Sequence, residues 1–405
     1  MATFYIATNG VNESTRDGSV GQEWATLSYA CSRVTTAGDV IHVNAGSYNE
    51  TAQCTLAPGV SIEGSGRTTT TITATSTITN LVYGSSSAGT DGRQSISNIT
   101  FNCNLNVTYG IRIIGRSNVQ IVNCGIQNAL DFGLIFADTT GRTSTTEPTL
   151  WAKNNVIRGN YFVNCGRDYF YDNSYWAAYS AIEISGQEDM LIYNNDIDNQ
   201  TGNRYGYGIK GLYYGGYFKA LKIYNNKIRT NIRDVSGQQS FGFNIELWTG
   251  VGGVEVFSND CNGGIDIGGR GWWDDYNYGY AIKVYDNSLI QNTRPTNQGE
   301  SGIILESGAR DGCYFYNNWV ENFSTGFYLG NTSNSLVQGY DNVWAYYNTF
   351  CNIGYTSGGV GAGWANGNVL RFNTIAAMYP IWCIRTVKQS EPTTLSDNFQ
   401  MMYRG

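Results

Sequence analysis

The chain has 405 residues and a formal net charge of −7, with only 14% charged residues and a single histidine. Its 41% hydrophobic residues can fill a core, and its many glycines and few prolines are typical of a β-rich, turn-rich protein rather than a disordered one. The acidic balance, without any Lys/Arg cluster, argues against a nucleic acid as partner. No apolar run reaches 18 residues, so no membrane insertion is expected.

The first fifty residues predict a cap and a first coil. Phe4-Tyr-Ile-Ala begins as a strand, with no basic segment or cleavage site of a signal peptide before it. A short helix is expected next, because its apolar residues share one face that could cover the open end of a core. These residues are Trp24, Leu27, Ala30, Cys31 and Val34.

From residue 99 onward one pattern repeats: a short apolar alternation that ends in an asparagine. The asparagines lie 21 to 37 residues apart, which predicts a solenoid, and the alternation predicts strands. They are expected to sit in one turn of each coil, where asparagine tolerates left-handed backbone angles and can bond to the asparagine of the next coil. The predicted anchors are Asn102, Asn123, Asn160, Asn195, Asn226, Asn259, Asn287, Asn318, Asn348 and Asn373.

A second strand pattern lies between the asparagines, as in Gly110-Ile-Arg-Ile, Gly264-Ile-Asp-Ile and Gly302-Ile-Ile-Leu. With a short strand after each turn, every coil has three strands. The chain is therefore predicted to be an all-β parallel β-helix with an N-terminal capping helix. The nine cysteines lack paired short spacings and are interpreted as stacked, buried thiols.

This layout resembles the right-handed parallel β-helix of the pectin lyase-like superfamily. The segment Gly38-Asp-Val-Ile-His-Val-Asn-Ala-Gly-Ser-Tyr48 is similar to the first coil of secreted and viral members. The resemblance covers about residues 3 to 385. We expect a single domain, with a cap at 1–50, the β-helix at 51–385 and a C-terminal tail or cap at 386–405.

Alternation predicts which side chains of the Gly-initiated strands leave the core. The predicted outward column contains Arg112, Ile135, Glu183, Lys210, Asn244, Asp266, Ile304 and Tyr328. A second outward column, two residues further on, contains Glu246 and Glu306. Glu183, Asn244 and Tyr328 are predicted to bind substrate, because polar and aromatic groups on a mostly uncharged surface suit a glycan.

Loops after these strands extend the candidate groove with Arg270, Trp272, Trp273, Asp274 and Arg310. Flat aromatic faces beside polar groups are typical of sugar-binding sites, although the same aromatics could simply pack loops onto the coil. The predicted partner is therefore a polysaccharide.

Two chemistries remain open from the sequence. Asp266 should lie about 8 Å from Glu246 and from Glu306, within the range of about 6.5–9.5 Å of an inverting glycosidase pair. Alternatively, Lys210 could act as the base of a β-elimination, with Arg270 or Arg310 neutralising a uronate. Either set of charged residues could also be only solvated or ion-paired.

Other catalytic systems are absent from the sequence. His42, the single histidine, is interpreted as structural, so neither the Gly-His-Gly motif of polygalacturonases nor the Asp-Pro-His motif of alginate epimerases is present. No cofactor or metal is expected; Asp196 with Asp198, or Asp274 with Asp275, could bind calcium weakly.

The favoured hypothesis is a polysaccharide hydrolase, or a lyase, that resembles phage tailspike depolymerases. That resemblance implies an extracellular or virion-associated location and a parallel homotrimer. The alternative hypothesis is a non-catalytic glycan adhesin or structural virion protein, because fold alone does not decide function.

Overall fold

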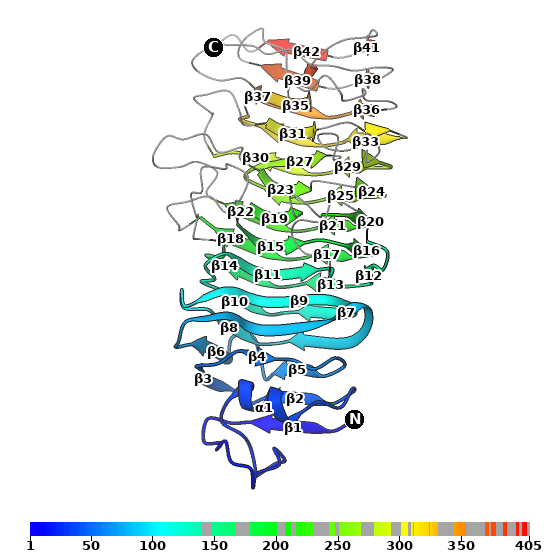
Figure 1. Ribbon diagram of the computed structural model, residues 1–405. Coiled ribbons are helices and arrows are strands. Elements are labelled where there is room, and N and C mark those ends of the chain that lie inside the picture. Colours follow the sequence, from blue (N-terminus) through cyan, green and yellow to red (C-terminus); the bar gives the residue numbers. More distant parts are fainter. Residues whose placement is uncertain are drawn as a thin grey trace. The chain divides into compact units, whose positions relative to one another are not determined.

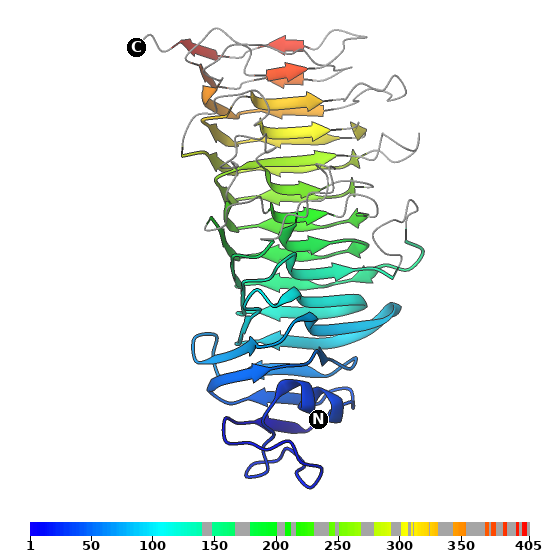
Figure 2. The ribbon, with the colours of Figure 1, turned by 60° about the vertical axis from the view of Figure 1, so that its left-hand side comes forward.

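The structure is a computed structural model of the chain, and its description is limited to part of the sequence. The described residues are 1–139, 148–166, 179–200, 207–211, 216–230, 243–247, 251–268, 279–292, 301–306, 309–310, 312–323, 325–330, 343–353, 369–371, 374–377, 384–386, 394–396 and 399–402. For Glu306, Arg310 and Tyr328 only the backbone is described. The chain divides into two compact units, Met1–Gly206 and Tyr207–Gly405, and each is a stack of coils (Figures 1 and 2).

Each coil of the first unit contributes parallel strands to three rows, and the long strands β7 and β9 run through both of the first two rows. Row 1 contains β4 (Cys54–Thr55), β7 (Ile78–Ser97), β9 (Val107–Val122), β11 (Phe132–Ala137) and β15 (Ser180–Ile184). Row 2 contains β1 (Thr3–Ile6), β2 (Val40–Val43), β5 (Ser61–Gly64), β7, β9, β13 (Val156–Arg158) and β17 (Leu191–Tyr193). Row 3 contains β3 (Gly46–Glu50), β6 (Thr70–Ala74), β8 (Thr100–Asn102), β10 (Gly125–Gln127), β14 (Tyr161–Val163) and β18 (Asp196–Asn199). The short strands β12 (Ala152–Lys153) and β16 (Gln187–Glu188) pair beside row 2.

The second unit has the same three rows. Row 1 contains β19 (Tyr207–Gly211), β23 (Phe243–Leu247), β27 (Gly264–Gly268), β31 (Ser301–Glu306), β35 (Thr325–Gly330) and β40 (Ile384–Thr386). Row 2 contains β21 (Lys222–Tyr224), β25 (Glu255–Phe257), β29 (Lys283–Tyr285), β33 (Cys313–Tyr316), β36 (Val343–Tyr346), β38 (Val369–Arg371) and β41 (Thr394–Ser396). Row 3 contains β22 (Lys227–Thr230), β26 (Asp260–Cys261), β30 (Ser288–Ile290), β34 (Trp319–Glu321), β37 (Thr349–Ile353), β39 (Thr374–Ala377) and β42 (Phe399–Met402). Short strands β20 (Phe218–Lys219), β24 (Val251–Gly252), β28 (Gly279–Tyr280) and β32 (Ala309–Arg310) pair with one another.

The three rows confirm the predicted parallel β-helix. Alternate residues of each row enter the core, so Ile245, Ile265 and Ile303 are fully buried one above the other. No helix among the described residues is long and apolar enough to span a membrane. The division into cap, helix and tail stays a prediction, although β41 and β42 continue rows 2 and 3 within residues 386–405.

An asparagine ladder joins the coils at the turn between rows 2 and 3. In the second unit the Oδ1 atom of Asn287 accepts hydrogen bonds from the backbone N–H and the side-chain amide of Asn259, at 3.1 and 3.0 Å. Its own amide donates to the carbonyls of Val256 and Tyr285. The same arrangement links Asn226 to Asn259, Asn287 to Asn318, Asn318 to Asn348 and, in the first unit, Asn160 to Asn195. The predicted coil-to-coil bonding of these asparagines is confirmed.

The predicted turn register was wrong for two anchors and for the left-handed angles. Asn123 lies one residue before the ladder position, which Cys124 occupies, and Asn102 ends β8 in row 3. Left-handed angles belong to the residue before each ladder asparagine, such as Gly159, Ser258 or Asp286, because the ladder asparagine itself must point inward. Asn373 lies outside the described residues.

The cysteines of the described residues are free, and all but Cys351, which is half-buried, are fully buried, as predicted. Burial raises the pKa of the Cys124 thiol and of the Cys165 thiol to about 12, so neither forms a reactive thiolate near neutral pH. Cys383 lies outside the described residues.

The predicted capping helix is α1 (Leu27–Arg33). The five apolar residues expected on it are all buried, but Trp24 precedes the helix and Val34 is its C-cap. Thr26 caps the helix through its hydroxyl, which accepts a hydrogen bond from the Tyr29 backbone N–H. The fully buried Glu50 of β3 accepts hydrogen bonds from the backbone N–H groups of Leu27 and Ser28. A carboxyl group buried in the first coil therefore holds the cap in place.

We expect Asn287→Ala to lower the free energy of unfolding by about 3 kcal/mol, because the buried N–H groups of Asn259 lose their acceptor. Urea denaturation followed by circular dichroism measures this change. Asn317→Asp is the matched control: Asn317 is an exposed turn residue with a left-handed angle that aspartate tolerates, and the control should change the free energy by less than about 0.5 kcal/mol. Equal effects of the two substitutions would contradict the ladder's role.

Burial raises the pKa of Glu50 above the ordinary glutamate value of 4.5, and this gives a pH test of the cap. The folded state binds the proton more tightly than the unfolded state, so stability should fall as the pH rises from 4.5 through the raised pKa. Glu50→Gln should remove this part of the pH dependence, as measured by the thermal midpoint between about pH 4 and pH 8. A constant difference between wild type and variant over this range would refute the prediction.

Candidate functional site

Row 1 of the second unit carries an in-register column of ionisable side chains. Lys210 of β19 is the register partner of Glu246 of β23, and Glu246 is the register partner of Asp266 of β27. Their neighbours along the strands, such as Ile245 and Ile265, are fully buried in the core. Alternation therefore directs the three ionisable side chains to the outer face of the sheet.

These side chains face outward from the coil, but they are not solvent-exposed. The exposed fractions are 5% for Lys210, 8% for Glu246 and 1% for Asp266. The predicted outward direction therefore does not bring these side chains into contact with bulk water. Removing charges from water is costly unless they are paired, so their contacts decide what this column can do.

Lys210 and Glu246 form a buried ion pair, with 2.9 Å between Nζ and Oε2. The same Nζ lies 4.2 Å from the centroid of the Tyr207 ring, which adds a cation–π contact. Tyr207 begins β19 and was not among the predicted site residues; its position three residues before Lys210 was the available signal in the sequence. With Asp266 on the next strand, the column contains one amine and two carboxyl groups.

The relation between Glu246 and Asp266 differs from the predicted one. They were assigned to different outward columns about 8 Å apart, but the strands place them side by side, where neighbouring strands are about 4.8 Å apart. The cause is an irregularity in β23: Phe243 pairs with Gly264 and Ile245 with Ile265, so Asn244 is an extra residue. The inserted residue shifts the register of β23, so that Glu246 rather than Asn244 becomes the partner of Asp266.

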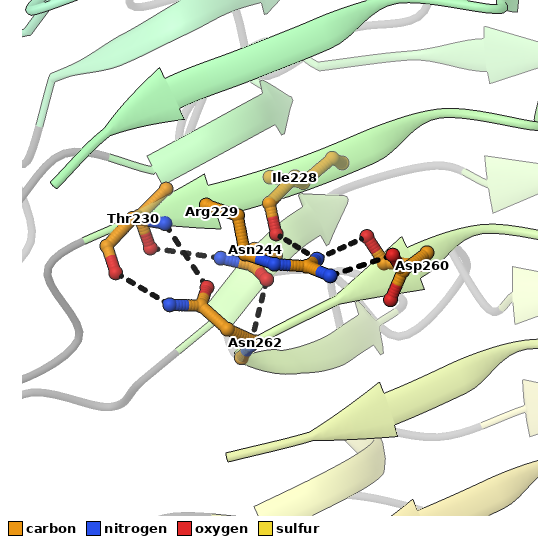
Figure 3. Close-up of polar contacts among 7 residues, drawn as sticks. Ile228, Arg229, Thr230, Asn244, Asp260 and Asn262 are labelled. Carbon is orange, nitrogen blue, oxygen red and sulfur yellow. Dashed lines mark hydrogen bonds and ion pairs between the residues drawn. The ribbon is translucent and has the colours of Figure 1, made fainter. Parts of the chain in front are cut away.

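Asn244 is consequently not a substrate-binding residue on the outer face, as had been predicted. It is fully buried, and its amide donates to the Thr230 hydroxyl at 2.8 Å while its Oδ1 accepts from the Gly263 backbone N–H (Figure 3). Asn262 completes this group by bonding to both backbone polar groups of Thr230. Asn244 therefore closes the turn between two coils.

The remaining predicted residues lie in several places. Glu306 is two residues beyond Ile304 in β31 and pairs with Gly268, so its backbone fits the predicted second column. Tyr328 pairs with Ile304, and Arg310 pairs with Tyr280 of the short strands. The predicted residues Arg270, Trp272, Trp273 and Asp274 lie outside the described residues.

The first unit holds its own part of the predicted column. Arg112, Ile135 and Glu183 are consecutive register partners, in the order expected. Glu183 is only 2% exposed, and the Arg112 guanidinium lies 5.2 Å from the centroid of the Tyr109 ring.

Two further expectations concern the role of His42 and the possible metal sites. His42 bonds to the Ser65 hydroxyl at 3.1 Å, which agrees with a structural role. No group of three or more His, Cys, Asp or Glu side chains that could hold a metal occurs in the described part of the chain. Of the two aspartate pairs considered for weak calcium binding, Asp196 and Asp198 are described by the structure, whereas Asp274 and Asp275 lie outside the described residues.

Comparison with known proteins supports the fold. No family model and no curated protein sequence matches the chain. A mannuronic acid-specific polysaccharide family 6 lyase from human gut microbiota matches with a TM-score of 0.54 and 12% identity over 96% of this chain and 83% of that one. A lacto-N-biosidase of family GH136 from Eubacterium ramulus matches with a TM-score of 0.50 and 10% identity over 99% of this chain and 68% of that one.

A third match is an open-reading-frame product of Geobacillus virus E2, with a TM-score of 0.45 and 12% identity; the chain spans 60% of that protein's length. At such identities the likeness concerns the fold alone. The predicted parallel β-helix fold is confirmed.

Breaking the buried ion pair should destabilise the second unit. Lys210→Met leaves the Glu246 carboxylate buried without its counter-ion, and we expect a loss of about 3–5 kcal/mol in the free energy of unfolding. The double variant Lys210→Met/Glu246→Leu should recover much of that loss, because no buried charge is left unpaired. Urea denaturation of both variants measures the two values. A double variant less stable than the single one would contradict the pairing.

Proposed function

We propose that the chain binds a polysaccharide and hydrolyses it at the Lys210–Glu246–Asp266 column. The observation that supports this most strongly is the burial of two in-register carboxyl groups and a lysine on the outer face of the sheet. Such an arrangement costs folding free energy and contributes nothing to the core of the coil. Costly ionisable clusters of this kind are concentrated at functional sites.

The spacing of the carboxyl groups favours one hydrolytic route. Neighbouring strands lie about 4.8 Å apart, close to the about 5–5.5 Å between the carboxyl groups of retaining glycosidases and shorter than the about 6.5–9.5 Å of inverting ones. The proposal therefore replaces the inverting pair expected from the sequence with a retaining pair of Glu246 and Asp266.

The contacts suggest a role for each residue. The ion pair with Lys210 fixes the position of the Glu246 carboxylate, which suits a nucleophile that attacks the anomeric carbon. Asp266 then gives its proton to the departing glycosidic oxygen. In the second step Asp266 takes a proton from water, and the resulting hydroxide displaces Glu246 from the sugar. Lys210 positions the nucleophile throughout.

The same ion pair argues against elimination with Lys210 as base. A base must be a neutral amine, and a neutral Lys210 would leave the Glu246 carboxylate buried without its counter-ion. A uronate would also bring a further carboxylate next to that of Glu246. A hydroxyl-rich, uncharged glycan fits it better.

The structural neighbours are consistent with this substrate class. The gut lyase is specific for mannuronic acid, and the Eubacterium protein is a lacto-N-biosidase, so two proteins of this fold act on carbohydrates. Assembly as a homotrimer, an extracellular or virion-associated location and the candidate subsites at Glu183, Glu306 and Arg310 remain predictions. A non-catalytic glycan adhesin is the competing proposal.

The test is a screen of the purified chain against neutral and uronate-containing polysaccharides. Reducing ends report hydrolysis, ultraviolet absorbance of unsaturated products reports elimination, and proton NMR of the first product shows whether the anomeric configuration is retained. We expect new reducing ends from a neutral glycan, and a loss of about 10²–10⁴-fold in rate for Glu246→Gln and for Asp266→Asn.

Asp260→Asn is the matched control, because Asp260 is a carboxylate of the same coil that is ion-paired with Arg229 at 2.6 Å on row 3. It should leave the rate unchanged. Binding of a glycan without any product, unaltered in the Glu246 and Asp266 variants, would reject hydrolysis and leave the adhesin.

A further inference from the structure

The exposed aromatic side chains of the described residues gather in one place. Large aromatic rings that reach solvent are Tyr314, Trp319, Trp344 and Tyr347, with Tyr347 58% and Trp319 43% exposed. All four belong to two consecutive coils of the second unit, at the corner where row 2 turns into row 3. We call these four residues the corner patch.

Two of the rings follow three charged residues in one column of row 2. Tyr314 and Trp344 are register partners on β33 and β36, and the buried neighbours Cys313 and Ala345 show that both side chains point outward. The same column in the preceding coils holds Lys222, Glu255 and Lys283, of which the first two form an ion pair at 3.6 Å. The aromatic pair is thus a local departure from a solvated, ion-paired surface.

Tyr347 is held in a backbone conformation that does not suit it. Its φ is 55°, in the left-handed region where a bulky side chain is a genuine outlier. The equivalent residues of earlier coils are ones that tolerate this region well, or are small: Asn225, Ser258, Asp286 and Asn317. Strain of this kind persists where function favours the side chain.

Polar groups accompany the rings. The Trp319 indole N–H donates to the Glu321 carboxylate at 3.0 Å, which fixes the orientation of the ring. Tyr347 packs edge-on against Tyr346, with 5.5 Å between centroids. Asp286 and Asn317, both exposed, lie in the same turn column as Tyr347. The patch therefore combines flat apolar faces with carboxylate and amide oxygens.

The neighbouring aromatic column has a different role. Tyr224, Phe257, Tyr285, Tyr316 and Tyr346 stack with centroid distances of 4.8 to 5.2 Å and are half-buried. Their faces cover one another, so only edges remain for solvent. This column stiffens the sheet, whereas the corner patch leaves ring surface exposed.

We propose that the corner patch is a second binding surface, separate from the Lys210–Glu246–Asp266 column, for an uncharged glycan chain. Exposed rings stack on the apolar faces of sugar rings, and carboxylate and amide oxygens accept hydrogen bonds from sugar hydroxyls. The carboxylates of Asp286 and Glu321 disfavour an anionic polymer. Charges interspersed among the rings disfavour the centre of a protein interface, where charged residues are depleted.

Affinity electrophoresis in gels that contain dextran, starch or galactomannan, with alginate and polygalacturonate as acidic gels, tests this surface. The Asp266→Asn chain is used so that the polysaccharide stays intact. We expect retardation in at least one neutral gel and in neither acidic gel. Trp344→Ala and Tyr347→Asn should each weaken the retardation about tenfold in apparent dissociation constant, whereas Leu150→Ala, an exposed apolar control in the first unit, should not change it.

Tyr347→Asn separates binding from folding. Asparagine tolerates the left-handed angle, so the thermal midpoint should stay unchanged or rise by about 1–2 °C while binding weakens. Retardation unaffected by the double variant Trp344→Ala/Tyr347→Asn, or no retardation in any neutral gel, would overturn the proposal. So would a concentration-dependent oligomer on gel filtration that the double variant abolishes, because the patch would then bind a second copy. Because hydrolysis is measured separately by product formation, either proposal can fail alone.

Discussion

Hydrogen bonding of buried asparagines between coils is the constraint on which the rest of this structure depends. A turn between two strands of a coil leaves backbone N–H groups inside, where an unsatisfied donor is costly. In the second unit the side chains of Asn259, Asn287 and Asn318 accept those N–H groups from the coil before and donate to carbonyls of the strands. These hydrogen bonds hold each coil in register with the next. The core isoleucines of successive coils therefore stack one above the other.

The fixed register has an electrostatic consequence on the other side of the coil. Strands held one above another place equivalent residues about 4.8 Å apart, so a column of ionisable side chains cannot avoid mutual contact. Lys210 and Glu246 form an ion pair, and Asp266 places a second carboxyl group beside them. The stacking that makes the core regular thus concentrates charge in row 1, where catalysis is proposed.

The turn that carries the ladder also shows where the chain departs from its own pattern. The residue before each ladder asparagine takes a left-handed angle, and most coils meet this demand with glycine, asparagine, aspartate or serine. Tyr347 adopts the same left-handed angle despite its bulky side chain, and its ring is exposed, as are those of Trp344 and Trp319. Because the other coils have suitable residues at this turn position, Tyr347 stands out as a candidate for a functional role.

The sequence by itself determined the fold, because the spacing of the asparagines and the alternation of apolar residues are local properties of the chain. It also determined the capping helix, the buried thiols and the membership of Arg112, Ile135 and Glu183 in one column. Only the tertiary structure decided that Glu246 stands beside Asp266, that Asn244 turns inward and that the charged column is buried. Alternation assigns faces and partners only within an unbroken strand, and the extra residue in β23 turns Asn244 inward and shifts the register after it. Register between strands joined by loops of unequal length is set by pairing in space, which the spacing of residues along the chain does not encode.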